Sequence, residues 1–383
     1  MTTQAYIQLF LLAHLKETDS LAAISDGLVD DNLQQAVGFQ EISPSQLSRQ
    51  HRGVDPSLLS TIFVDLVHQI RHFHRKASRR IPLKIIDSST IPLDLKRYKW
   101  AKFRKTKAGV KLHLRLVYMD RDTTYPDKAV LTPAKKHDRG QLDVLVDDKE
   151  SMYVFDRGYI DDERFDRMTD EGYFFVSRHR KNACVRVLES FPLTEDSPVL
   201  SHQMIVIGTS QNGTENVFRL LKVVDTEGDQ LLLMTNRFDG RAEEIANMYH
   251  DRWAIELFFK WLKQHVKIKA LYGFDETAVH NQIFLALIVY CLHVLIQLET
   301  NSNKRILQIS RRLKAALWKP SRVWIRRFDN RAVPKRTLLV VCTRVLNVSF
   351  SQKDRAPLCS GLSFYHSLTA NNIMKFLTIF MQC

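Results

Sequence analysis

The chain has 383 residues, of which 45% are hydrophobic, so it is long and apolar enough to build a packed globular core. It contains 56 basic and 42 acidic residues, and the resulting formal charge of +14 favours a polyanionic partner, most simply nucleic acid. The longest apolar run, residues 283–298, is shorter than the roughly 20 residues needed to span a bilayer, so it predicts a core helix and no membrane partner. The sequence shows no secretory signal, and its five cysteines are scattered without a C-x-x-C pair. A cytoplasmic location is therefore predicted.

The N-terminal part of the chain has a helical pattern. Apolar residues recur at spacings of three and four within residues 6–12 and again within 58–64. Between these runs, Ser43 and Pro44 precede a short basic segment that ends near Arg52, which predicts a helix start. Such a start can also face phosphate, although the capping role is the more common one. We expect residues 1–80 to form a helical DNA-binding region.

From Leu83 onward the pattern changes to that of strands. Residues 83–87 read as a short buried strand, residues 110–118 alternate as a strand does, and residues 130–131 and 151–155 are further candidates, with a polar helical stretch at 138–149. A β-rich segment follows at about 174–236, with strands predicted at 174–176, 204–207, 217–224 and 231–235. We interpret this segment as an insertion in a mixed α/β catalytic domain that covers residues 81–300.

Two stretches concentrate positive charge. No acidic residue lies between Asp94 and Asp120, and this stretch carries the basic residues Lys102, Arg104, Lys105, Lys107 and Lys111, which predict a track for the DNA backbone. The C-terminal region, 301–383, begins with twelve lysines or arginines within 304–336 against a single acid, interleaved with Trp318 and Trp324. A DNA-contacting arm and a solvated helix face are equally compatible with that second pattern.

Two predicted strands end in a carboxylate. Asp87 follows Ile85 and Ile86, and Asp156 follows Val154 and Phe155. A single aspartate after a strand is usually a turn former or a helix cap. In an α/β sheet, however, functional groups gather at strand ends, so the two side chains are expected to converge.

A long helix is predicted from about residue 240 to 265. At about 100° per residue, Tyr249, Arg252, Glu256 and Lys263 fall within an arc of roughly 60° that borders an apolar face. An ordinary surface pair between Arg252 and Glu256 has the same spacing. Charges beside large aromatic residues nevertheless need partners such as a metal or a phosphate, because unpaired charge is costly there.

Asp87, Asp156 and Glu256 together offer only oxygen ligands, the type that Mg²⁺ or Mn²⁺ prefers. Two such ions, roughly 3.5 to 4 Å apart, can activate a water or a 3′ hydroxyl for attack on a phosphodiester. Arg252 and Lys263 would then clamp phosphate oxygens, and Tyr249 would donate its hydroxyl to a phosphate. The expected chemistry is phosphodiester cleavage and transfer.

These residues resemble a known pattern. The order Asp87, Asp156, Glu256, with the helix spacing Tyr-x2-Arg-x3-Glu-x6-Lys, resembles the bacterial DDE transposases of the insertion-sequence-four family. Four short blocks are also similar to that family, so the resemblance covers roughly residues 5–320: Asp87-Ser-Ser-Thr, Gly109-Val-Lys-Leu-His-Leu, Phe155-Asp-Arg-Gly-Tyr and Thr235-Asn-Arg-Phe.

The resemblance implies a ribonuclease-H-like catalytic core with a β-rich insertion between the second aspartate and the glutamate. It also implies cut-and-paste DNA transposition of an insertion sequence, in which a homodimer in a synaptic complex binds terminal inverted repeats and joins them to target DNA near the nucleoid. Two alternatives stay open at this point. One is a nuclease on the same core that cleaves without strand transfer, and the other is a non-catalytic or decayed DNA-binding relative.

Overall fold

A computed structural model of the protein describes residues 1–77, 81–193, 197–209, 213–225, 227–265 and 271–319. The chain divides into two compact units, one formed by Met1–Ala77 and the chain from Leu262 onward, the other by Ser78–Trp261. The predicted catalytic range, 81–300, is thus longer than the second unit, because residues 276–299 pack with the N-terminal helices. The functions assigned to residues 1–80, 81–300 and 301–383 stay predictions.

The first unit is helical. Its elements are α1 (Thr3–Lys16), α2 (Leu21–Asp26), the 3₁₀ turn η1 (Gly27–Val29), α3 (Asp31–Val37), α4 (Pro44–Gly53), α5 (Pro56–Ala77), α10 (Glu276–Glu299) and α11 (Ile306–Ala316). The predicted helix start at Ser43 is confirmed. The Ser43 hydroxyl accepts a hydrogen bond from the Gln46 N–H, and the Gln46 side chain accepts one from the Ser43 N–H, which satisfies two donors that the first turn leaves unpaired.

Helix α10 is the core of this unit. It is long and apolar enough to cross a membrane, but 94% of its most apolar window is buried among the helices of its own unit. Asn281 in its first half donates to the backbone carbonyls of His51 and Val54, which ties α10 to the end of α4. The predicted core helix is therefore confirmed.

The last described helix of the first unit, α11, is amphipathic. Ile306, Ile309 and Leu313 are buried, whereas Arg311 is exposed. An exposed Arg311 is compatible with both a solvated basic face and a DNA-contacting arm, so the two interpretations of the basic C-terminal region stay open. The remainder of that region, 320–383, lies outside the described residues.

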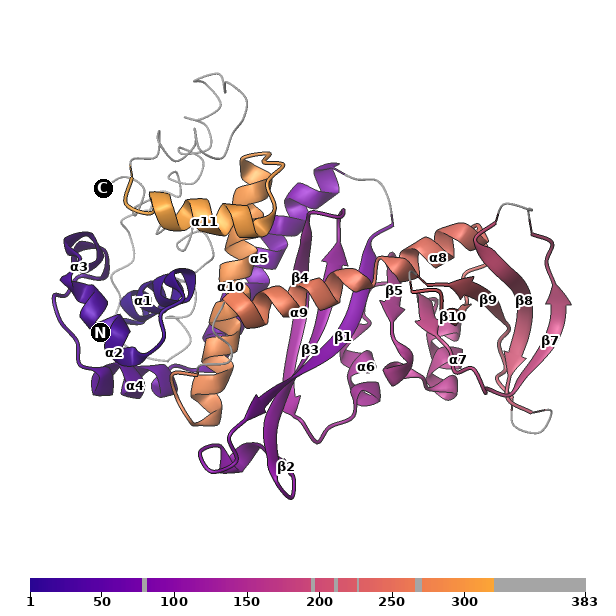
Figure 1. Ribbon diagram of the computed structural model, residues 1–383, viewed down its shortest axis with the longest axis horizontal. Coiled ribbons are helices and arrows are strands. Elements are labelled where there is room, and N and C mark those ends of the chain that lie inside the picture. Colours follow the sequence, from indigo (N-terminus) through magenta and orange to yellow (C-terminus); the bar gives the residue numbers. More distant parts are fainter. Residues whose placement is uncertain (78–80, 194–196, 210–212, 226, 266–270, 320–383) are drawn as a thin grey trace, which may run out of the picture. The chain divides into compact units, whose positions relative to one another are not determined.

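Ten strands among the described residues form one sheet in the second unit (Figure 1). They are β1 (Leu83–Leu93), β2 (Lys102–Arg104), β3 (Lys107–Tyr118), β4 (Thr124–Pro133), β5 (Met152–Phe155), β6 (Phe174–Arg178), β7 (Val185–Ser190), β8 (Val199–Ile207), β9 (Phe218–Val224) and β10 (Gln230–Thr235). The order is β2-β3-β1-β5-β6-β10-β9-β8-β7, with β4 also paired to β3. Strands β1, β5 and β6 run parallel, and the other pairs are antiparallel.

The strands predicted within 174–236 are confirmed, but they do not form a separate layer. Strand β10 pairs with β6, so β10, β9, β8 and β7 continue the sheet that begins with β1, β5 and β6. The mixed α/β class is confirmed in this coarse form.

Strand β1 is longer than predicted. It does not end at Asp87 but continues to Leu93, because β3 pairs with it along its whole length, from Leu83 opposite Tyr118 to Leu93 opposite Ala108. Gly109 permits this close approach, since a Cβ at that position would lie 2.9 Å from the carbonyl oxygen of Ile91. The prediction that Asp87 ends a strand was wrong, whereas Asp156 does directly follow β5.

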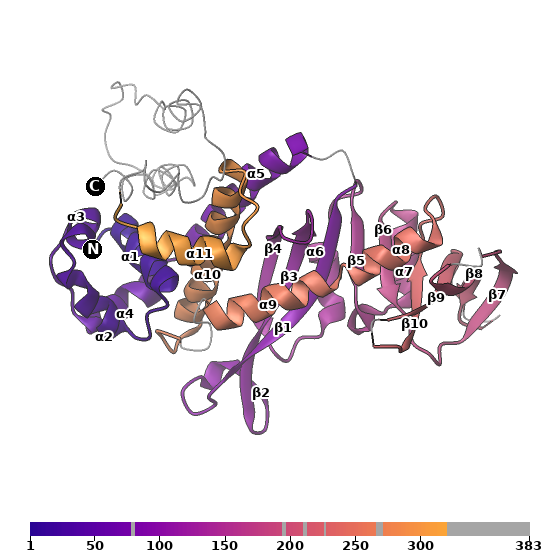
Figure 2. The ribbon, with the colours of Figure 1, turned by 45° about the horizontal axis from the view of Figure 1, so that its top comes forward.

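Helices lie on both faces of this sheet. Helix α8 (Ala242–His250) and the start of α9 (Trp253–His265) lie on one face, and α6 (Leu142–Leu145) and α7 (Asp162–Asp170) lie on the other, as Figure 2 shows. Three short 3₁₀ turns, η2 (Lys99–Ala101), η3 (Asp138–Gln141) and η4 (Arg157–Tyr159), complete the unit. The predicted polar helix at 138–149 is thus a 3₁₀ turn followed by a single α-helical turn.

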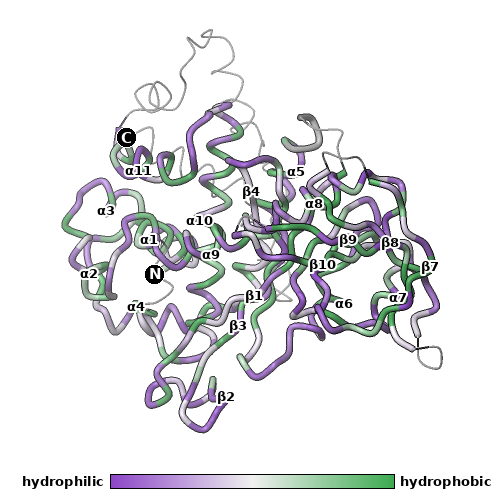
Figure 3. The backbone as a smooth tube through the Cα atoms, turned by 45° about the vertical axis from the view of Figure 1, so that its right-hand side comes forward, coloured by the Kyte–Doolittle hydropathy of each residue, from purple (hydrophilic) through white to green (hydrophobic). Residues whose placement is uncertain are grey.

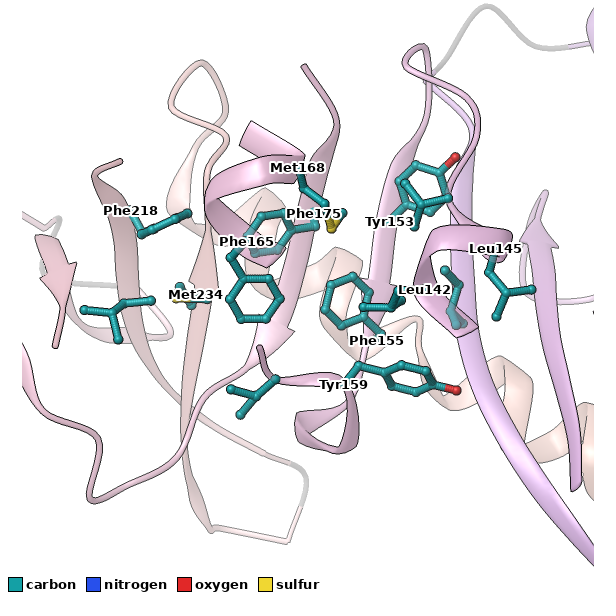
Figure 4. Packing of buried hydrophobic residues seen from close by; sticks show 14 of the residues in the cluster. Leu142, Leu145, Tyr153, Phe155, Tyr159, Phe165, Met168, Phe175, Phe218 and Met234 are labelled. Atoms are coloured by element: carbon teal, nitrogen blue, oxygen red, sulfur yellow. The ribbon is translucent and has the colours of Figure 1, made fainter. Parts of the chain in front are cut away.

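The face under α6 and α7 is an apolar cluster. Phe155, Phe165 and Phe175 stack in it, with ring centroids of Phe165 and Phe175 4.7 Å apart (Figure 4). The hydropathy colouring of Figure 3 shows hydrophobic stretches along the strands and more hydrophilic connections between them. Because each buried aromatic side chain contributes about 1.5 to 3 kcal/mol relative to exposure, this cluster holds β5 and β6 firmly in register.

The helix predicted from 240 to 265 is interrupted. Helix α8 ends at His250 and α9 begins at Trp253, so the prediction of one continuous helix was wrong. At the break, the Arg252 N–H donates to the Tyr249 carbonyl and the Ile255 N–H donates to the Arg252 carbonyl, each across three residues. These shorter hydrogen bonds tighten the turn, which leaves Tyr249 before the break, Arg252 within it and Glu256 after it.

Candidate active site

Asp156 is placed by a fully buried strand. All four residues of β5 are buried, and Asp156 is the first residue to leave the core. The hydroxyl of Tyr249, on α8, donates to its Oδ1 at 3.3 Å. Burial, followed by the charge of Asp156, raises the pKa of Tyr249 above its usual range, so the phenol stays a neutral hydrogen-bond donor.

Arg252 bridges the other two predicted carboxylates. Its Nη2 lies 2.6 Å from Glu256 Oε1, and its Nη1 lies 3.8 Å from Asp87 Oδ2. The guanidinium is only 16% exposed, and its Nε has no hydrogen-bond partner among the described residues. The pair is therefore more than a surface i,i+4 contact, because a third charged group from strand β1 takes part in it.

The surroundings of Asp87 are crowded with negative charge. Burial, and then the charges of Asp156 and Glu256, raise the pKa of the Asp87 carboxyl to about 6, although the Ser88 N–H and Arg252 act in the opposite direction. Asp87, Asp156 and Glu256 thus share one neighbourhood, with one arginine among three acids. A carboxylate held in such a place favours an added cation.

The ligand atoms that the three acids offer are of the type that a hard divalent cation prefers. All three side chains offer carboxylate oxygens, and no sulfur or imidazole ligand accompanies them. Within the described ranges, however, no three His, Cys, Asp or Glu side chains are arranged as a ready metal site. The Arg252 guanidinium contacts both Asp87 and Glu256.

Lys263 lies in the last turn of α9 and is half-buried. It belongs to the first unit, whereas the three carboxylates belong to the second. Its predicted contact with a phosphate beside these carboxylates therefore stays a prediction.

The predicted basic track separates into two parts. Lys102, Arg104, Lys105 and Lys107 are exposed on the hairpin of β2 and β3, which extends from the sheet in Figure 1. Lys111 differs from them, since its side chain is 15% exposed and its Nζ lies 3.3 Å from Asp138 Oδ1. Lys111, the last residue of the predicted track, is thus paired with Asp138 of the same unit.

Sequence reasoning missed a second basic group. A pocket of about 540 Å³ beside Asp156 is lined by four cationic side chains for which the described part of the chain provides no acidic partner: Arg157, Arg178, Arg180 and Lys181. His179 in its wall is 4% exposed, and neither of its ring nitrogens has a hydrogen-bond partner among the described residues. The signal in the sequence was the run Arg178-His-Arg-Lys directly after a predicted strand.

Comparisons with known proteins identify the family of the chain. Residues 78–292 match the family model described as "Transposase DDE domain". The chain is 29% identical over 294 residues to the "Probable transposase for insertion sequence element IS5377" of Geobacillus stearothermophilus, covering 76% of this chain and 75% of that one. It is 32% identical over 223 residues to the "Putative transposase y4zB" of Sinorhizobium fredii, covering 56% and 60% respectively.

Among solved structures, the chain is similar to the piggyBac transposase in its synaptic complex with hairpin DNA. The TM-score is 0.44 at 10% identity, over 92% of this chain and 77% of that one, and the family assignment does not depend on it. Because the matched segment spans more than half of the sequence, the chain belongs to the DDE transposase family of bacterial insertion sequences, whose members cleave DNA and transfer its strands.

Proposed function

We propose that Asp87, Asp156 and Glu256 are the catalytic carboxylates of this transposase and that they hold two Mg²⁺ or Mn²⁺ ions within a ribonuclease-H-like core. One observation carries the proposal. The three acids, from β1, from the end of β5 and from α9, are all contacted by two neighbouring residues, since Arg252 lies 3.8 Å from Asp87 and 2.6 Å from Glu256 and the Tyr249 hydroxyl donates to Asp156. Divalent metal ions are the general cofactor of the family. When bound, they activate the attacking water or 3′ hydroxyl and stabilise the leaving oxygen.

The other side chains of the site bind and orient. Arg252 presents two Nη groups, a geometry that suits the oxygens of a phosphate as well as those of Asp87 and Glu256. Tyr249 keeps its hydroxyl proton and can therefore donate it to a phosphate oxygen as it does to Asp156. Lys263 is proposed to bind a further phosphate.

Two basic surfaces are proposed to hold the DNA backbone. The exposed residues Lys102, Arg104, Lys105 and Lys107 on the β2–β3 hairpin form one. The pocket lined by Arg157, Arg178, Arg180 and Lys181 forms the other, beside Asp156. Cations without acidic partners repel one another, so phosphate groups are the natural occupants of both surfaces.

The proposed substrates are the terminal inverted repeats of an insertion sequence and a target DNA, brought together by a homodimer in a synaptic complex. The helical region 1–80 and the basic region 301–383 are proposed to contribute to DNA binding. The proposed place of action is the bacterial cytoplasm, at the nucleoid.

The test is incubation of the purified protein with its own element ends, Mg²⁺ and a target plasmid. We expect cleaved ends and joined product. Glu256→Gln should abolish cleavage and leave end binding unchanged, because it removes a charge from the site and keeps the shape of the side chain. Glu244→Gln is the matched control, since this exposed α8 residue caps Arg241 through an oxygen that glutamine also provides.

The same experiment separates the alternatives. Cleavage without joined product would favour a nuclease on this core. End binding without cleavage, with Glu256→Gln and the natural protein behaving alike, would favour a non-catalytic DNA-binding relative and contradict the proposal.

A further inference from the structure

A fourth acid lies behind the candidate active site. Asp138 opens η3, directly before α6, and its side chain is 25% exposed. The Ser88 hydroxyl donates to its Oδ1 at 2.7 Å, and Lys111 Nζ donates to its two oxygens at 3.3 and 3.4 Å. Two residues of the paired strands β1 and β3 thus converge on one carboxylate from a different part of the chain.

Ser88 connects this acid to Asp87. The Ser88 N–H donates to Asp87 Oδ1 at 2.7 Å, while its hydroxyl donates to Asp138. Successive side chains of a strand point to opposite faces, so Ser88 faces α6 together with Ile86, and Asp87 faces the helices α8 and α9. A continuous series of hydrogen bonds therefore runs from Asp138 through the sheet to the Asp87 carboxylate.

The groups around Asp138 leave it a single charged partner. His113 is fully buried, with Nδ1 3.4 Å from Asp138 Oδ1 and Nε2 2.9 Å from Thr132 Oγ1. Burial lowers the pKa of His113 to about 4, so its ring is neutral at pH 7. Burial, then the charges of Asp87 and Asp138, raise the pKa of the Tyr159 phenol, which is also neutral. Within the described part of the chain, Lys111 is then the charged partner of Asp138.

We propose that Asp138 is a positioning residue for Asp87: it fixes Ser88 from the opposite face of the sheet, with Lys111 as its counter-ion, and so holds the Asp87 carboxylate in one orientation. The inference rests on the proposed function in taking Asp87 as a catalytic carboxylate. It also gives a role to Lys111 and His113, which both lie in the block Gly109-Val-Lys-Leu-His-Leu. Lys111 then serves the active site from within the protein, and of the predicted basic track it is the exposed hairpin residues that remain available to DNA.

The geometry explains why such support is needed. Asp87 lies 3.8 Å from the guanidinium of Arg252, which attracts it, and close to the charges of Asp156 and Glu256, which repel it. Without a second anchor, its side chain could follow Arg252 or turn away from Asp156. The Ser88 N–H holds one carboxylate oxygen of Asp87. The position of this N–H depends on the backbone at Ser88, so fixing Ser88 also fixes Asp87.

The test compares Asp138→Asn, Ser88→Ala, Ser88→Thr and the double variant Asp138→Asn/Ser88→Ala in the full chain. Three quantities are measured: the single-turnover rate of element-end nicking at saturating Mg²⁺, the affinity of the DNA-free protein for Mn²⁺ by electron paramagnetic resonance, and the affinity for end DNA in Ca²⁺. Asp143→Asn is the matched control. This α6 residue also pairs with an arginine, Arg164, but its side chain is 62% exposed and it bonds no residue of β1.

We expect Asp138→Asn and Ser88→Ala each to lower the nicking rate and the Mn²⁺ affinity about tenfold, the usual effect of removing support from a ligand. Affinity for end DNA should stay unchanged, and Ser88→Thr, which keeps the hydroxyl, should behave like the natural protein. The double variant should be no worse than the worse single variant, because both changes break one series of hydrogen bonds. If Asp138→Asn does not fold, the comparison of Ser88→Ala with Ser88→Thr decides.

Unchanged nicking and Mn²⁺ affinity in Asp138→Asn, or losses that add in the double variant, would overturn the inference while leaving the proposed function intact. A natural protein that binds Mn²⁺ yet cleaves no DNA would contradict the proposed function, and the Mn²⁺ series would still decide the role of Asp138. A natural protein that neither binds Mn²⁺ nor cleaves DNA would contradict both the proposed function and the positioning role of Asp138.

Discussion

Two arginines of the second unit, the buried Arg115 and the half-buried Arg252, are surrounded by acids in different ways. Arg115, on β3, donates from Nε and Nη2 to Asp127 at 2.7 and 3.0 Å and from Nη1 to Asp147 and the Leu145 carbonyl. Lys84 and Lys128 pair with Asp148 and Asp147 nearby, so three cations meet three acids. Arg252, by contrast, stands alone among Asp87, Asp156 and Glu256.

The difference separates structure from function. In the Arg115 group, each cation has an acidic partner and the charges balance, so we call this a closed group and the Arg252 group an open one. In the Arg252 group, three carboxylates surround one guanidinium, so the acids outnumber the cation that contacts them and a pair of divalent ions can bind there. The same residue types thus form a stabilising ion-pair network around Arg115 and a candidate catalytic site around Arg252.

The largest expected effect concerns stability. Arg115→Met removes both hydrogen bonds that Arg115 donates to Asp127, whose side chain is 0% exposed, so we expect a loss of about 3 to 5 kcal/mol in the free energy of unfolding. Arg252→Met should cost less than about 1 kcal/mol, because Glu256 is 37% exposed and Asp87 can take up a proton. Urea unfolding at pH 7 measures both, and equal losses would contradict the contrast between a closed and an open group.

The pH dependence of stability should have opposite signs in the two groups. The pKa of Asp87 is raised to about 6 in the folded protein, so ionisation opposes folding, and metal-free stability should fall by at most about 3 kcal/mol as pH rises from 4 to above 6. Lys84 and Ser151 lower the pKa of Asp148 to about 2 despite its burial, so its contribution is present above pH 4 and is lost as pH falls toward 2.

Urea unfolding across this pH range, with Asp87→Asn as the comparison, measures the first effect. The variant should lose the decline between pH 4 and 6 and exceed the natural protein in stability at pH 7. A variant that keeps the same decline would assign it to another group.

A divalent ion should stabilise only the open group. At a Mn²⁺ concentration 100 times the dissociation constant, binding to the folded state should add about 2.7 kcal/mol to the free energy of unfolding. Asp87→Asn should remove most of this gain, whereas Asp148→Asn, in the closed group, should keep it. Thermal unfolding with and without Mn²⁺ measures the difference, and equal gains in both variants would place the ion elsewhere.

The smallest effects are expected on the exposed hairpin. Replacing Lys102, Arg104, Lys105 or Lys107 by alanine should weaken binding to all DNA sequences alike and reduce the slope of log affinity against log salt by about 1 each. Lys149→Ala is the matched control, since this exposed lysine lies over the Tyr173 ring. Fluorescence anisotropy at several salt concentrations checks this, and Lys111→Ala should leave the slope unchanged.

The parts of the site that sequence predicted are those fixed locally. Asp156 leaves the core directly after a run of buried residues, and that run is visible in the sequence. The position of Asp87 within β1 was not predictable in the same way, because the length of β1 is set by its pairing with β3. The break at Arg252 carries no glycine or proline to mark it, and Lys111 is engaged by Asp138, 27 residues further along the chain.

The pocket beside Asp156 was missed for a related reason. Three of its four basic residues, Arg178, Arg180 and Lys181, are close in sequence, but they line a cavity with Arg157 only because β10 pairs with β6 and brings residues 230–232 beside them. A run of basic residues is visible in a sequence, whereas the pocket that these residues line depends on tertiary structure.

The continuity of the sheet has a mechanical meaning. Because β6 is bonded to β5 on one side and to β10 on the other, the outer strands β7, β8 and β9 cannot swing as a hinged flap without rupturing the rungs that join Arg178 to Leu233 and Val176 to Thr235. The strand pairs β5–β6 and β6–β10 therefore join the outer strands to the end of β5, where Asp156 leaves the sheet.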